Sequence, residues 1–265
     1  IPQNVQRPGG VRHRLEHMLD SNNGRYGQRG RFRHERLFTL IRDLHRRHFI
    51  LTASMAAAMG IYAPGIGAQT TARAAPKATK AAVILVLGDS LSAEYGLPRG
   101  SGWVALLEKQ LAADKISASV VNASVSGETT SGGRSRIAAL LQQHQPTHVV
   151  IELGGNDALR GLPLQNTQDN LTFMTQAAQK AGAKVLLVGM QVPPNYGTDY
   201  ANRFAALFET VAKAQKAAVV PFFLKGVADG ADPTRMFQPD RIHPKAEAHP
   251  LMLANVWPEL KKMLR

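Results

Sequence analysis

The chain has 265 residues, of which 44% are hydrophobic, and it has no cysteine. Its length allows one large domain or two small ones, and the missing cysteine excludes disulfides, thiolate metal sites and a cysteine nucleophile. The formal net charge of +13 is uneven, because residues 1–50 carry a net +7 and residues 81–265 only +3. The body of the chain therefore has no basic surplus that would predict nucleic-acid binding.

Residues 1–45 mix Arg, His, Gly, Gln and Asn with few apolar positions. A segment of this composition cannot bury enough apolar surface to offset the entropy lost on ordering, so the sequence predicts a disordered basic extension. Two interpretations are open, a nucleic-acid-binding arm or upstream sequence read in frame ahead of the true start. We favour the second interpretation, under which the extension would not be native.

Residues 46–74 have the order of an export signal. Arg46-Arg47 precede an uncharged, weakly apolar run over residues 51–68, and Ala72-Arg73-Ala74 forms a small-residue cleavage site. The arginine pair resembles a twin-arginine signal, although a general secretory signal has the same order. A transmembrane anchor is the competing interpretation, which Gly and Pro within the run disfavour. We expect cleavage near Ala74 and a periplasmic or secreted monomer without a stable membrane anchor.

From residue 81 onward, apolar runs of strand length alternate with longer amphipathic segments. Val, Ile and Leu dominate the runs, which is typical of strands buried on both faces. The predicted strands are Ala82–Leu87, Ala118–Asn122, His148–Leu153, Lys184–Gly189 and Ala218–Phe222. The predicted helices are Trp103–Ala113, Arg134–Gln143, Gln168–Ala181, Tyr200–Ala214 and Glu247–Leu264, the last one bent at Pro250 or Pro258. This alternation predicts a single domain over residues 75–265, an α/β flavodoxin-like three-layer sandwich with a five-stranded parallel sheet.

Polar residues follow the predicted strands at the edge where such sheets bind ligands. Ser90 follows the first strand, Gly127 the second and Asn156 the third. Each has an ordinary explanation as a helix cap or a turn residue. Near the C-terminus, Asp240 and His243 are spaced so that the carboxylate can hold Nδ1–H and leave Nε2 free as a base. No further ligand stands near this pair, so we expect no metal and no cofactor.

Together these segments supply a nucleophile, a glycine N–H, an amide and an oriented histidine, which are the parts of an acyl-transfer site. The stretches GDSLS, NASVSGETTSGG, GGND and DRIHP, in this order, resemble the four blocks of the SGNH (GDSL) hydrolase family. The likeness is closest to its bacterial arylesterase, acyl-CoA thioesterase I and lysophospholipase branch. The resemblance implies Ser90 as nucleophile, His243 as base and Asp240 as its orienting group. It also implies that the oxyanion donors are the N–H groups of Ser90 and Gly127 and the side chain of Asn156.

Apolar residues in the loops at this edge are candidates for the substrate-binding wall. They are Leu159, Leu162, Pro193, Tyr196, Phe237 and Ile242. Such a lining suits a fatty acyl chain, although ordinary loop packing explains several of these residues equally well. We expect a small-molecule ester or thioester as the substrate. The alternatives are a carbohydrate acetylesterase on the same fold and a basic-tailed binding protein in which residues 1–50 act.

Overall fold

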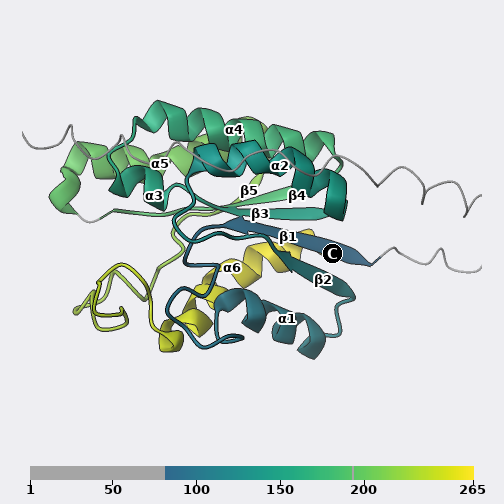
Figure 1. Ribbon diagram of the computed structural model, residues 1–265, viewed down its shortest axis with the longest axis horizontal. Helices are drawn as coiled ribbons and strands as arrows, with labels where there is room; N and C mark the ends of the chain where they lie inside the picture. Colours follow the sequence, from purple (N-terminus) through teal and green to yellow (C-terminus); the bar gives the residue numbers. More distant parts are fainter. Residues whose placement is uncertain (1–80, 193) are drawn as a thin grey trace, which may run out of the picture. The chain divides into compact units, whose positions relative to one another are not determined.

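The computed structural model describes residues 81–192 and 194–265 (Figure 1). The predicted basic extension at residues 1–45, the export signal at residues 46–74 and the candidate wall residue Pro193 lie outside the described residues.

Five parallel strands form one sheet in the order β2-β1-β3-β4-β5. They are β1 (Ala82–Gly88), β2 (Ala118–Asn122), β3 (His148–Glu152), β4 (Lys184–Val188) and β5 (Ala218–Val220). Each lies within two residues of its predicted bounds, because most residues of every run are Val, Ile, Leu or Ala, which suit a covered sheet. The strand order and the parallel pairing confirm the predicted flavodoxin-like α/β sandwich.

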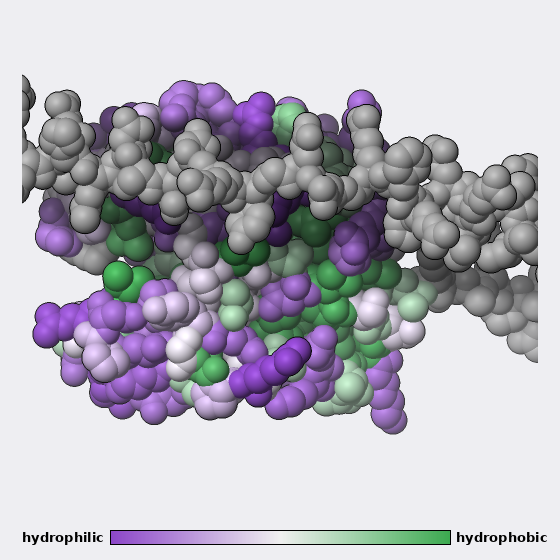
Figure 2. Space-filling model, in the orientation of Figure 1, coloured by the Kyte–Doolittle hydropathy of each residue, from purple (hydrophilic) through white to green (hydrophobic). Residues whose placement is uncertain are grey.

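The expectation of burial on both faces is correct for the central strands and wrong for β2. Every residue of β3 is buried, whereas β2 is half-buried to exposed along its length. The reason is position, since β2 pairs only with β1 and forms an edge of the sheet. Figure 2 shows hydrophobic surface near this edge and mainly polar surface over the helices.

Helices cover both faces of the sheet. In Figure 1, α2, α4 and α5 lie on one side of it and α1 and α6 on the other, and the contacts among these helices agree. Among the described residues no helix is long and apolar enough to cross a membrane. The helices are α1 (Trp103–Ala113), α2 (Thr130–His144), α3 (Gly155–Leu159), α4 (Leu164–Lys180), α5 (Thr198–Gln215) and α6 (His249–Met263), with 3₁₀ turns at Pro194–Tyr196 and Ala246–Ala248.

Three helices begin earlier than their sequence pattern predicts, α2 and α4 by four residues and α5 by two. The α2 helix starts at Thr130 because Thr129 caps it, its Oγ1 accepting the Gly132 N–H at 3.2 Å. Gly133, which reads as a helix breaker, lies where α2 meets the sheet, and a Cβ there would come within 2.4 Å of Leu153 Cδ1. The α4 helix starts at Leu164, directly after Pro163.

The chain reverses its direction of travel across the sheet between β1 and β3. After β1 it moves outward to β2 and then returns to the other side of β1 as β3. In open α/β sheets, ligands bind beyond the carboxyl ends of the strands at such a switch point. Ser90 follows β1 and Asn156 follows β3, so the fold brings both to this position.

Candidate active site

Ser90 lies in a tight, mostly buried turn directly after β1. The side chain of Asp89 accepts the Leu91 N–H at 3.0 Å, and its carbonyl accepts the Ala93 N–H at 3.0 Å. Asp89 and Ser92 are 1% exposed and Ser90 is 8% exposed. Ser90 is not among the residues with positive φ, so the turn is not a strained nucleophile elbow. The local sequence thus fixes a serine hydroxyl at the carboxyl end of β1.

His243 and Asp240 reach Ser90 from the loop before α6. His243 Nε2 is 3.0 Å from Ser90 Oγ, and His243 Nδ1 is 2.7 Å from Asp240 Oδ2. Asp240 Oδ1 also accepts the N–H groups of Ile242 and His243, at 2.9 and 3.0 Å. Partial burial raises the pKa of Asp240, but these hydrogen bonds outweigh it and lower the pKa to about 2. The carboxylate therefore stays ionised and can hold the imidazole in one orientation.

The turn between Asp240 and His243 depends on an unusual backbone conformation. Arg241 has a φ of 60°, in the left-handed region that non-glycine residues rarely adopt. This turn lets both following N–H groups point back at one carboxylate oxygen, while the other oxygen holds the ring.

Three N–H donors lie on the segments around Ser90. Asn156, in α3, donates from Nδ2 to Asp89 Oδ2 at 3.0 Å, which leaves its second amide hydrogen for a ligand. Gly127 has a φ of +78° in the β2–α2 loop. Among residues 81–192 and 194–265, neither the Ser90 N–H nor the Gly127 N–H donates a hydrogen bond to another described residue. These groups are available to stabilise a developing negative charge.

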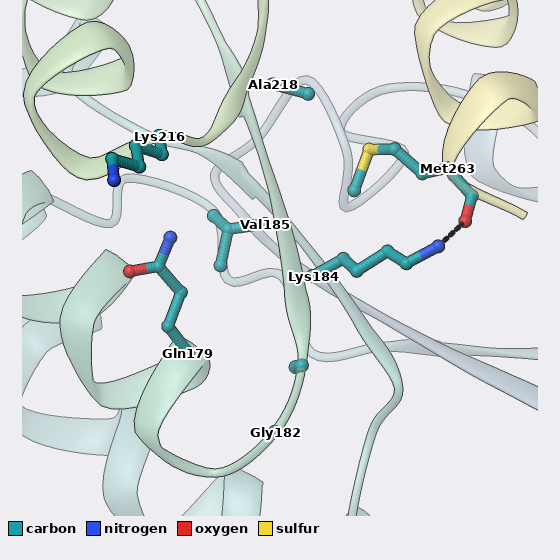
Figure 3. A pocket seen from close by; sticks show the side chains of 8 residues that line it. Gln179, Gly182, Lys184, Val185, Lys216, Ala218 and Met263 are labelled. Atoms are coloured by element: carbon teal, nitrogen blue, oxygen red, sulfur yellow. Dashed lines mark hydrogen bonds between the residues drawn. The ribbon is translucent and has the colours of Figure 1, made fainter.

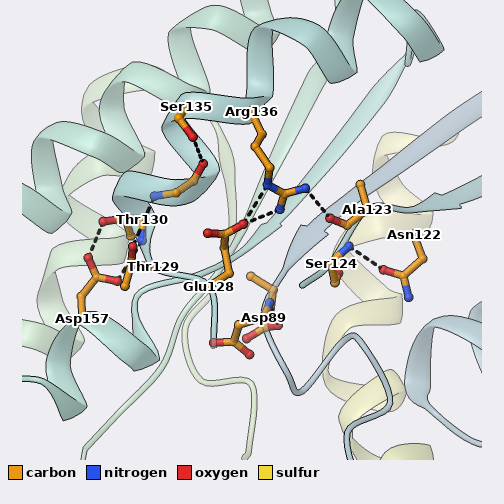
Figure 4. A network of polar contacts seen from close by, with 12 residues as sticks. Asp89, Asn122, Ala123, Ser124, Glu128, Thr129, Thr130, Ser135, Arg136 and Asp157 are labelled. Carbon is orange, nitrogen blue, oxygen red and sulfur yellow. Dashed lines mark hydrogen bonds and ion pairs between the residues drawn. The ribbon is translucent and has the colours of Figure 1, made fainter. Parts of the chain in front are cut away.

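Polar contacts join the segments that carry Gly127 and Asn156. Asp157 accepts the Thr130 N–H at 2.9 Å and the Thr130 hydroxyl at 2.5 Å, which ties α3 to the start of α2 (Figure 4). Arg160 Nη2 donates to the Gly127 carbonyl at 2.9 Å. Asp157 and Arg160 were not among the predicted site residues, and their only sequence signal is that they lie one and four residues after Asn156.

The loop after β2 is braced on its other side by an ion pair. Arg136 of α2 donates from Nε to Glu128 Oε2 at 2.8 Å and from Nη1 to the Ala123 carbonyl at 3.0 Å (Figure 4). Gly127, which precedes Glu128, is therefore held between this brace and the Thr130 contacts.

A buried carboxyl group, that of Glu152, accepts hydrogen bonds from the Ser90 turn. Glu152, the last residue of β3, accepts the Ser92 hydroxyl at 2.6 Å, and Trp103 Nε1 donates to the same Ser92 Oγ at 3.0 Å. Glu152 is 2% exposed. Burial, reinforced by the neighbouring Asp89 charge, raises the pKa of Glu152 well above its ordinary value. Burial likewise raises the pKa of Asp89. In the sequence, Glu152 has no signal beyond its place in the predicted strand His148–Leu153.

Comparison with known proteins places this site in a family. A family model, that of the GDSL-like lipase/acylhydrolase family, matches residues 86–251 of the chain. This range includes Ser90, Asp240 and His243. The chain belongs to this family. The resemblance derived from the sequence motifs is thereby confirmed.

Several GDSL-like relatives are similar over most of their own length. Esterase TesA of Pseudomonas aeruginosa is 51% identical over 184 residues, covering 69% of this chain and 90% of the relative. Thioesterase 1/protease 1/lysophospholipase L1 of Escherichia coli K12 is 42% identical over 176 residues, covering 66% and 82%. A crystal structure of TesA matches with a TM-score of 0.66 over 68% of this chain and 99% of that one, at 51% identity. A structure of the psychrotrophic esterase EstA from Pseudoalteromonas, inhibited by monoethylphosphonate, matches with a TM-score of 0.64 at 41% identity, covering 69% and 98%.

The predicted wall residues of this GDSL-like hydrolase fall into two groups. Leu159, Tyr196 and Ile242 are exposed, at 40%, 38% and 48%, in the segments that follow β3, β4 and β5. Leu162 and Phe237 are half-buried, and Phe237 forms a bridge with Pro244 that closes the His243 turn. Phe237 therefore shapes the loop that carries His243, whereas the other three expose apolar surface.

Two cavities among the described residues are lined by residues outside the Ser90 site. One of about 480 Å³ is at the opposite end of the sheet, between the start of β4 and the end of α6, lined among others by Gln179, Lys184 and Met263 (Figure 3). Another of about 240 Å³ lies between α4 and α5. In the described ranges, no cluster of three or more His, Asp or Glu could hold a metal ion.

Proposed function

We propose that the chain cleaves carboxylic esters and thioesters through a covalent acyl-enzyme on Ser90. The observation that carries this proposal is the continuous hydrogen-bonded series from Ser90 Oγ to His243 Nε2, at 3.0 Å, and from His243 Nδ1 to Asp240, at 2.7 Å. A nucleophile, a base within reach of it and a third group that orients the base are the geometric signature of acyl transfer. The names of the relatives, esterase and thioesterase among them, support the same substrate class.

In the first half of the reaction, Ser90 Oγ attacks the acyl carbonyl carbon while His243 Nε2 takes the hydroxyl proton. Asp240 stabilises the imidazolium that forms without itself accepting the proton. The negative charge moves to the former carbonyl oxygen, where the N–H groups of Ser90, Gly127 and Asn156 donate to it. The bond to the leaving alcohol or thiol then breaks, and His243 returns the proton to the leaving group.

In the second half, water attacks the acyl-Ser90 carbonyl and gives a proton to His243 Nε2. The same three donors hold the oxyanion. The carbon–oxygen bond to Ser90 breaks, the carboxylic acid leaves, and the proton returns to Ser90 Oγ. Because Asn156 is already fixed by Asp89, its amide needs little reorganisation when the charge develops.

The proposal is tested by substrate turnover together with covalent labelling. The protein is assayed against p-nitrophenyl esters and acyl thioesters of increasing chain length, and then incubated with an alkyl phosphonate ester. We expect hydrolysis of both classes and a single phosphonyl adduct on Ser90, located by mass spectrometry of peptides. Ser135→Ala, which removes an exposed hydroxyl on α2, is the matched control and should label and turn over normally. An adduct elsewhere, or turnover without labelling of Ser90, contradicts the assignment.

Leu159, Tyr196 and Ile242 are proposed to contact the acyl chain or the leaving group. Their side chains are exposed in the segments that follow β3, β4 and β5, and apolar surface of this kind gains from burial against a hydrocarbon chain. Leu162 and the undescribed Pro193 remain further candidates for this wall. Replacement of Leu159 by Ser should raise KM more for long acyl chains than for acetate esters, since only long chains reach an apolar rim.

The proposed cellular location is the periplasm or the exterior, as a monomer. It rests on the order of residues 46–74, which is that of an export signal. N-terminal sequencing of the enzyme recovered from a bacterial host tests it, with a first residue near Ala75 expected. Protein that keeps residues 46–74 and stays inside the cell contradicts it. Replacing both arginines of Arg46-Arg47 by Lys separates the routes, because only a twin-arginine signal requires arginine.

A further inference from the structure

The loop that carries His243 packs on the core through Val227, Met236 and Phe237, but it makes few hydrogen bonds to the rest of the fold. Most residues from 225 to 242 are exposed. Near its end the loop folds on itself, because Phe237 bridges to Pro244 and the Gln238 N–H donates to the His243 carbonyl at 2.8 Å. These contacts fix the turn internally, but they do not fix its position relative to Ser90.

Gln238 supplies the missing link between the two segments. Its Nε2 donates to the Pro244 carbonyl at 3.1 Å, inside the turn, and to the Tyr95 carbonyl at 3.0 Å, in the segment that follows Ser90. Within the described residues, the only other hydrogen bond between residues 225–245 and residues 89–96 is the one from His243 to Ser90. Apart from the His243–Ser90 hydrogen bond itself, the Gln238 amide is thus the hydrogen-bonded link between these two segments among the described residues.

The backbone at Gly96 leaves room for this amide. Gly96 has a φ of +69°, and a Cβ built there would lie 2.3 Å from Gln238 Oε1. The Gln238 side chain therefore packs directly over the peptide that follows Tyr95.

Tyr95 carries the contact onward to the imidazole. Its ring lies against the His243 ring, with centroids 4.2 Å apart and planes tilted by 35°. Tyr95 is held at its carbonyl by Gln238 and touches His243 with its ring. A displacement of the Tyr95 segment would therefore reach the base directly.

We propose that Gln238 is a positioning residue that holds His243 over Ser90 by tying the His243 turn to the Ser90 turn. The proposal rests on the proposed function, in which His243 Nε2 takes the proton of Ser90. Gln238 bonds two backbone carbonyls and acts through the placement of the base. Misplacement of a reacting group by about 1 Å costs on the order of 100-fold in rate.

Two substitutions in the full chain test whether Gln238 positions His243. Gln238→Ala removes the amide, and Gln238→Glu keeps its shape but replaces the donating NH₂ with an oxygen that faces two carbonyls. We expect both to lower kcat on a p-nitrophenyl ester by roughly 10- to 100-fold, with KM within about twofold of the wild-type value. Gln165→Ala is the matched control, because Gln165 donates its amide to Asp169 within α4, and it should leave kcat unchanged.

A spectroscopic readout separates positioning from stability. The Tyr95 ring should shift the ring-proton NMR signals of His243, which are assigned by comparison with His243→Gln. In both Gln238 variants we expect this shift to diminish, while the thermal unfolding midpoint stays within a few degrees of wild type. A wild-type kcat in both variants would overturn the positioning role of Gln238. An activity loss that merely follows a loss of folded protein would overturn it as well. An inactive wild-type chain, or a Ser90→Ala variant that keeps its activity, instead overturns the proposed function.

Discussion

The two halves of the candidate site differ in how the fold holds them. The Ser90 turn is part of the interior, with Asp89 and Ser92 buried and with contacts to Glu152, Trp103 and Asn156. The turn that carries Asp240 and His243 is at the surface and is held by its own backbone contacts and by Gln238.

This difference separates two chemical tasks. Stabilising an oxyanion requires donors that do not move when charge develops, and the buried half supplies them. Proton transfer requires a base within hydrogen-bond reach, which the exposed half meets with one oriented ring. Changes in the buried half are therefore expected to affect stability and rate together, and changes in the exposed half mainly the rate.

The largest effect is expected from Ser90→Ala. Loss of the nucleophile should lower kcat by on the order of a millionfold, because the acyl-enzyme cannot form. Circular dichroism and thermal unfolding should show a folded protein, since only one hydroxyl is lost. Activity of more than a few per cent of wild type would exclude Ser90 as nucleophile.

Asp240→Asn probes the exposed half at almost constant volume. The variant should lose about 10⁴-fold in kcat, because the amide neither stabilises the imidazolium nor selects the correct tautomer. Its unfolding midpoint should stay close to wild type, since Asp240 lies at the surface. Asp199→Asn, at another exposed carboxylate that pairs with Arg203, serves as the control for charge loss. If Asp240→Asn lowered the unfolding midpoint strongly as well as kcat, the two halves would not differ in the way described.

Asn156→Ala probes the donors of the buried half. We expect kcat to fall by about 100- to 1000-fold with little change in KM, because an oxyanion donor acts chiefly in the transition state. The variant should also unfold at a somewhat lower temperature, because Asp89 loses the hydrogen bond from Asn156. The exposed Asn166 of α4 provides a matched Asn→Ala control. An effect confined to KM would assign Asn156 to ground-state binding.

The smallest expected effect concerns stability against pH at Glu152. Burial raises the pKa of Glu152 in the folded protein well above the ordinary 4.5 of the unfolded chain. Its contribution to stability is therefore fully present below that value and is lost as the pH rises toward the folded pKa. Glu152→Gln replaces the titrating carboxyl group with an amide, which stays neutral at every pH. The thermal unfolding midpoint of the variant should therefore rise relative to that of wild type as the pH increases from 5 to 9.

Glu108→Gln, at an exposed carboxyl on α1, is the control for the Glu152 experiment and should run parallel to wild type at every pH. Parallel curves for Glu152→Gln as well would show that the group titrates normally in the folded protein.

Much of the fold followed from the sequence because each strand is built mostly from Val, Ile, Leu and Ala. The same reasoning placed Ser90, Gly127 and Asn156 at one edge of the sheet, since the carboxyl ends of parallel strands meet there. The α3 helix was missed because five residues beginning with glycine carry no helical period.

The contacts that support the site could not be predicted from the sequence for a different reason. Gln238 and Tyr95 are separated by 143 positions, and their contact depends on how one loop lies on another. Glu152 ends an apolar strand, and only the assembled sheet brings Ser92 and Asp89 to its carboxyl group. Sequence patterns describe faces and ends of elements, whereas these partners are set by tertiary packing.

The left-handed backbone at Arg241 limits which residues the position can accept in evolution or in a designed library. A φ of 60° costs most residues about 1–2 kcal/mol and β-branched residues more, whereas Gly and Asn adopt it readily. In a saturation library selected for activity, Gly and Asn should be enriched at this exposed position, and Val, Ile and Thr depleted. Tolerance to mutation there would then be governed by torsion angles and not by side-chain chemistry.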